Sequence, residues 1–90
     1  MHPPDKKALS ELNELIQRLL SLGLLNEEDL DSILKMLSKG EVTDITISDF
    51  SVKPDWPSRE QFVVSFPFAG YEEHFSRQTL MDFLSSRRTH

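Results

Sequence analysis

The apolar residues of this chain change type near residue 42, and this change limits the possible folds more than any other feature. Residues 1–41 contain no aromatic side chain and are rich in leucine, whereas residues 42–76 contain seven of the eight aromatic residues and most of the β-branched ones. Leucine favours helices, while aromatic and β-branched side chains favour strands. The order therefore predicts helices first, a sheet second and a closing helix over the residues that follow.

The leucine-rich part contains two segments that are each bounded by helix signals. The first is expected to begin near Asp5 or Lys6 and to end at Gly23; the second has Asn26 as its N-cap and ends at Gly40. A connection this short predicts an antiparallel αα-hairpin. The apolar positions of the first segment recur at steps of three and four: Leu9, Leu12, Leu15, Ile16, Leu19 and Leu20.

The aromatic part predicts three antiparallel strands joined as a meander. The first is expected over residues 42–52, with a bulge near residues 48–49 because the alternation of apolar side chains slips phase there. Two prolines within residues 54–58 predict a loop. The second and third strands are expected over residues 60–68 and 71–75.

These elements predict one α+β domain that covers residues 1–90. An N-terminal αα-hairpin packs with a three-stranded antiparallel meander and a C-terminal helix capped by Ser76, in the order α-α-β-β-β-α and in two layers. Ninety residues are too few for two separate cores. Residues 1–5 and 87–90 are expected to be mobile ends.

The side chains that carry out most enzyme chemistry are scarce or scattered. The chain has no cysteine, no GxSxG motif, and three glycines too far apart to build a phosphate-binding loop. His74 stands alone in the third strand, and the other two histidines lie at the chain ends. The acidic run at residues 27–31 begins a helix, where negative charge is stabilising, and lacks the spacing of a calcium loop. We therefore expect no catalytic residue, no cofactor and no metal site, and we predict that the protein is not an enzyme.

The sequence also predicts a cytoplasmic protein that does not enter a membrane. Glu11, Glu14 and Arg18 interrupt the leucine-rich stretch, which a secretory signal does not tolerate. No run of eighteen apolar residues occurs that could span a bilayer.

The net charge of −5 indicates the kind of partner. A negative field steers an acidic protein toward basic surfaces, which predicts a small protein-interaction module, a regulator or inhibitor, that binds a basic partner protein. The alternative is a dimeric nucleic-acid-associated regulator that uses Arg87 and Arg88 of the C-terminal helix, with Arg77 nearby. The overall negative charge makes nucleic acid the less favoured partner.

Four residues are candidates for partner contact besides these arginines. Trp56 and Asp55 lie on a loop flanked by prolines. The Trp56 ring is expected to cover the core as a lid, and the alternative is that it anchors an interface. Leu20 and Leu24 belong to a surplus of apolar surface on and after the first helix, which suggests a homodimer through that helix.

Overall fold

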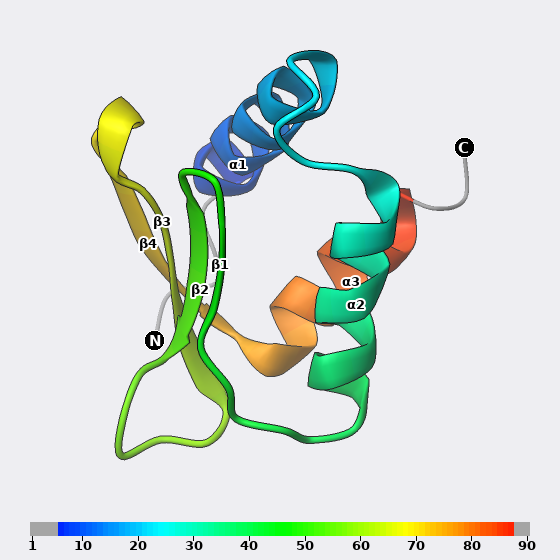
Figure 1. The fold of residues 1–90 in the computed structure, drawn as a ribbon. Coiled ribbons are helices and arrows are strands. Elements are labelled where there is room, and N and C mark those ends of the chain that lie inside the picture. Colours follow the sequence, from blue (N-terminus) through cyan, green and yellow to red (C-terminus); the bar gives the residue numbers. More distant parts are fainter. Residues whose placement is uncertain (1–5, 88–90) are drawn as a thin grey trace.

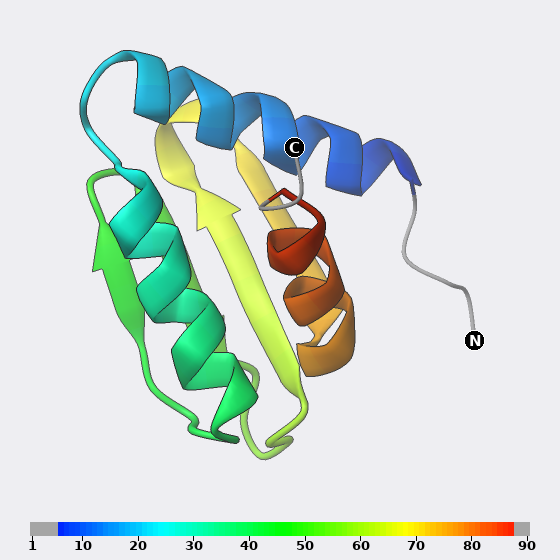
Figure 2. The same ribbon diagram turned by 90° about the vertical axis from the view of Figure 1, so that its right-hand side faces the viewer.

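A computed structural model of the chain describes residues 6–87, which form three helices and a four-stranded antiparallel sheet. The strands lie in the order β1-β2-β3-β4, so each pairs with the next one along the chain. All three helices lie on the same side of the sheet (Figures 1 and 2). The expected α+β class is confirmed. The elements are α1 (Lys6–Ser21), α2 (Glu27–Ser38), β1 (Ile45–Ile47), β2 (Phe50–Pro54), β3 (Gln61–Phe66), the 3-10 turn η1 (Pro67–Ala69), β4 (Tyr71–Ser76) and α3 (Arg77–Arg87).

The sheet has four strands and not three, because the segment expected as one bulged strand is a hairpin. Ser48 and Asp49 form a two-residue turn between β1 and β2, and Ile47 pairs with Phe50 across it. Ser48 has φ 57°, the positive value that such a turn needs at its first central position. The alternation of apolar side chains changes phase at residues 48–49 because one strand ends there and a second strand begins, and not because of a bulge.

Helix α2 begins and both helices end where the local signals predict, whereas the expected cap of α1 at Asp5 lies outside the described residues. The two helices do not form an antiparallel hairpin. Asn26 caps α2: its side chain accepts from the Asp29 N–H at 3.0 Å, and the Asp29 carboxylate accepts from the Asn26 N–H at 3.0 Å. Figure 2 shows α1 crossing one end of the sheet while α2 runs beside α3. The hairpin expectation is wrong because α1 packs on the sheet, where the Tyr71 hydroxyl donates to the Ala8 carbonyl at 2.8 Å.

The core lies between the sheet and the helices as one connected cluster. Phe62, Val64 and Phe66 alternate along β3 and are fully buried, as their spacing predicts. The Phe66 ring stacks on Phe50 at 5.0 Å and meets the Tyr71 ring edge-on at 5.8 Å. The helices contribute Leu12, Ile16, Ile33 and Leu37 to this cluster, and Leu15 packs against it from the side.

Arg77, which the sequence places near a basic surface patch, is instead buried at the start of α3 with 7% of its surface exposed. Its guanidinium lies 5.0 Å from the centre of the Phe62 ring. The group joins the end of α2, the loop before β3 and the start of α3. Its hydrogen bonds go to the Glu60 carboxylate at 2.9 Å, to the carbonyls of Leu37 and Glu41 at 3.0 Å each, and to the Arg59 carbonyl at 2.6 Å.

Candidate functional site

Four large apolar side chains are exposed between residues 6 and 87: Leu22, Leu24, Trp56 and Phe68. Leu24 and Phe68 line the same pocket, whereas Trp56 lies on the β2–β3 loop at the opposite end of the molecule (Figure 1). Apolar side chains scattered singly are common on protein surfaces, but several around one hollow mark an interaction site. The end that carries Leu24 and Phe68 is therefore the candidate site.

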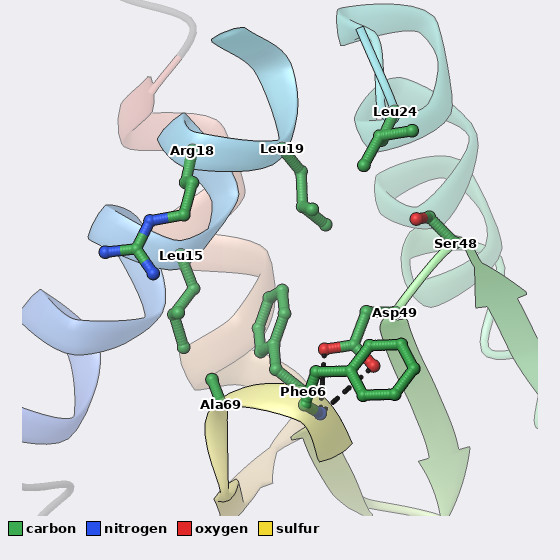
Figure 3. Close-up of a pocket in the computed structure, with 9 residues that line it drawn as sticks. Leu15, Arg18, Leu19, Leu24, Ser48, Asp49, Phe66 and Ala69 are labelled. Carbon is green, nitrogen blue, oxygen red and sulfur yellow. Dashed lines mark hydrogen bonds between the residues drawn. The ribbon is translucent and has the colours of Figure 1, made fainter. Parts of the chain in front are cut away.

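The hollow at this end is a cavity of about 300 Å³ where three connections meet. These are the α1–α2 loop, the β1–β2 turn and η1. Figure 3 shows how the side chains surround the cavity. We call it the apolar pocket; it is lined by Leu15, Leu19, Leu24, Phe66, Phe68 and Ala69, together with the polar residues Arg18, Ser48 and Asp49.

Phe68 is exposed on a backbone that is held in place. The residue is 96% exposed, the largest exposed fraction among the four. Its backbone N–H donates to both carboxylate oxygens of Asp49, at 3.3 and 3.2 Å (Figure 3). Gly70 ends η1 with φ 66°, a left-handed conformation that glycine adopts without strain. The β1–β2 turn thus fixes the tip of the β3–β4 connection, so the aromatic ring is presented from a defined position.

An acidic groove adjoins the apolar pocket. Four glutamates line this second cavity of about 410 Å³: Glu11 and Glu14 from α1, and Glu72 and Glu73 from β4. The two cavities share Leu15, Arg18 and Ala69, so they form one continuous surface. We use the name acidic groove for the cavity lined by the four glutamates.

Tyr71 forms part of the groove wall and stays neutral there. Burial raises the pKa of the Tyr71 phenol above its ordinary value, and the nearby carboxylates of Glu73 and Glu11 raise it further. The neutral hydroxyl donates to the Ala8 carbonyl. This bond fixes the distance between α1 and β4, the two walls of the groove.

Five of the six residues predicted to contact a partner are described by the structure, and among these five Leu24 alone lines the apolar pocket. Leu20 is half-buried against the core. The lid interpretation of Trp56 is wrong, because 62% of this residue is exposed and its loop extends away from the helices. Asp55 Oδ2 accepts a hydrogen bond from His74 Nδ1 at 3.0 Å, and both side chains are exposed.

Arg87, which was predicted to belong to an exposed basic patch, is largely buried and bonded within the protein. This side chain is only 11% exposed; it donates to Asn13 Oδ1 at 2.7 Å and lies 3.5 Å from a Glu27 carboxylate oxygen. Arg87 ends α3, and the rest of the expected mobile ends, Arg88 included, lies outside the described residues.

The sequence did not single out Phe68 or the four glutamates of the acidic groove as site residues. Phe68 was missed because residues 60–68 were expected to form one strand. A proline rarely sits inside a strand ladder, so Pro67 was the signal that β3 ends at Phe66. The residue after this proline then falls in a turn, where the alternation of the strand no longer applies.

Within residues 6–87, no group of three or more histidine, cysteine or acidic side chains is arranged to hold a metal ion. None of the three described helices combines the length and the apolar character needed to cross a bilayer. Comparison with protein-family models, curated proteins and solved structures finds no match for the chain.

Proposed function

We propose that this protein is a non-enzymatic interaction module that binds a basic segment of another protein through the apolar pocket and the acidic groove. It would act as a regulator or inhibitor by covering that basic segment. An apolar side chain of the partner fills the pocket, and neighbouring lysines or arginines lie against the four glutamates of the groove.

The observation that carries this proposal is the pairing of exposed Leu24 and Phe68 around the apolar pocket. Burying one large apolar side chain contributes about 1.5–3 kcal/mol, which a partner could gain here. The groove beside the pocket supplies charge complementarity to a basic chain, and the net charge of −5 favours the encounter at long range. A homodimer through α1 has less support, because Leu9, Leu15 and Leu20 are already packed against the core.

A selection from displayed random peptides tests the proposal without a known partner. We expect the recovered peptides to combine lysine or arginine with leucine or phenylalanine, and to lose binding to a Phe68→Ser variant. Trp56→Ser is the matched control, since it removes an exposed aromatic ring at the opposite end. If Trp56→Ser abolishes binding and Phe68→Ser does not, the site lies at the β2–β3 loop and the proposal is wrong.

The charge of the groove is tested separately with the same peptides. Glu11→Lys combined with Glu14→Lys should weaken binding strongly, and raising the salt concentration should weaken binding to the unmodified protein. Glu41→Lys combined with Asp44→Lys, which makes the same change of charge at two exposed positions just before β1, should have little effect. If neither the salt concentration nor the two groove substitutions change the affinity for the peptides, a basic partner is ruled out.

A further inference from the structure

We infer that the basic partner segment binds as an extended strand that pairs with the outer edge of β4 and continues the sheet. This inference rests on the proposed function and adds the conformation of the bound segment. Its foundation is the position of β4, the last strand of the sheet, directly beside the acidic groove.

The backbone of β4 offers hydrogen-bonding groups on its outer side. The Arg77 N–H donates to the Glu60 carbonyl at 2.9 Å, which fixes the phase of the ladder between β3 and β4. In an antiparallel pair every second residue bonds to the neighbouring strand, so the backbone groups of Glu72 and His74 point away from β3. The described sheet has no strand on that side. An extended chain could therefore pair with both residues.

The groove and the strand edge coincide. Glu73 shares the helix-facing side of β4 with the buried Tyr71, and it lines the groove together with Glu11 and Glu14 of α1. Figure 2 shows the N-terminal part of α1 projecting beyond β4, so an added strand would run beneath this helix. Lysines on the helix-facing side of the added strand would then face the three carboxylates. Because the two cavities adjoin, the end of the bound segment would reach the apolar pocket.

The charges on β4 favour a basic strand over a second copy of this chain. Two β4 edges brought together would place Glu72 and Glu73 against the same acidic residues of the other copy, which disfavours self-pairing. A basic strand gains attraction at the same positions. The opposite edge of the sheet, β1, is only three residues long and offers a much shorter template.

The test uses a capped synthetic peptide of alternating lysine and valine that ends in leucine and phenylalanine. It is compared with two forms in which the backbone nitrogens of alternate residues are methylated, one form for the lysines and one for the valines. Methylation removes the N–H groups along one edge of an extended chain. We expect one methylated form to bind about tenfold more weakly or worse, because it loses the bonds to β4, and the other to bind like the parent. Amide hydrogen exchange at Glu72 and His74 should slow when the parent peptide binds.

Several results would overturn strand addition. The first is equal binding of all three peptides with unchanged exchange at Glu72 and His74; this outcome would leave the proposed function intact, since the parent peptide still binds. A peptide that becomes helical on binding, measured by circular dichroism, would equally exclude a strand. Protection of the same two amides in a peptide-free dimer would assign the edge to a second copy. If the parent peptide does not bind at low salt, strand addition of this chemistry fails, and the displayed-peptide selection then decides the proposed function independently.

Discussion

Replacing Arg77 with alanine is expected to lower the free energy of unfolding by about 3–5 kcal/mol, because a buried polar group that loses its hydrogen-bond partner costs about 1–3 kcal/mol and several such groups surround Arg77. The guanidinium donates to one carboxylate and to three backbone carbonyls, and it covers the Phe62 ring. Alanine would leave three carbonyls from separate segments without these donors. The free energy of unfolding of a whole domain of this length is about 5–13 kcal/mol, so the substitution would remove a large fraction of the stability.

The ion pair and the carbonyl hydrogen bonds of Arg77 are expected to contribute unequally to stability. The Glu60 side chain is 70% exposed, so its ion pair with Arg77 is solvent-screened and Glu60→Gln should cost only about 0–1 kcal/mol. Arg77→Lys should fall between the two, because an ammonium group cannot reach the carbonyls of Leu37, Glu41 and Arg59 in one planar arrangement. The carbonyls, and not the ion pair, are therefore expected to account for most of the effect.

Urea denaturation followed by circular dichroism measures these differences, provided that the dependence of the free energy of unfolding on urea concentration is the same for all variants. Arg59→Ala is the matched control, since Arg59 contributes its backbone carbonyl and its exposed side chain can be removed within about 0.5 kcal/mol. A loss below about 1 kcal/mol for Arg77→Ala, or a loss for Glu60→Gln as large as that for Arg77→Ala, would contradict this account of the network.

Three further substitutions probe other parts of the fold. Tyr71→Phe removes the bond to the Ala8 carbonyl and should cost about 0.5–1.5 kcal/mol near neutral pH. The pKa of Tyr71 is raised in the folded state, so the wild type should lose stability as pH rises above about 10, where the unfolded phenol ionises first, and the Phe variant should lose less. Because the chain has one tyrosine, ultraviolet absorbance reports this titration directly, and an ordinary value would contradict it. Asn26→Ala removes the side-chain oxygen that accepts from the Asp29 N–H, and it should lower the free energy of unfolding in urea by about 0.5–2 kcal/mol. Ser32→Ala on the exposed face of α2 should not lower it. Ser48→Gly should stabilise the hairpin by about 0.5–1 kcal/mol by relieving the positive φ, and a loss of thermal stability would argue against strain at this turn.

Features that depend on neighbours in the sequence were predictable, and features set by distant segments were not. The ends of α1 and α2 follow from Gly23, Asn26 and Gly40, because caps act within one turn. The β1–β2 turn escaped prediction because Ser48 and Asp49 lack the glycine or asparagine that usually marks such a turn.

The direction of α1 and the burial of Arg77 are set by distant contacts. The Tyr71 bond to Ala8 joins residues that are 63 positions apart. The carbonyls around Arg77 come from segments up to 40 positions away. The candidate site needs three connections to meet at one end, so the sequence alone could indicate Leu24 but not its association with Phe68.

Phe66 and Phe68 illustrate why the candidate site can exist without weakening the fold. Alternation along one strand would place both rings on the same face, yet Phe66 is 1% exposed and stacks on Phe50, while Phe68 is 96% exposed after the break at Pro67. The hydrophobic contribution of Phe66 is already used in holding the sheet to the helices. That of Phe68 adds almost nothing to folding, because its ring remains in water, so about 1.5–3 kcal/mol can still be gained when another chain covers it. The proposed binding module needs a surface of this kind, which adds little to the stability of the monomer; Pro67 ends the strand before it, and the Asp49 carboxylate holds its backbone in place.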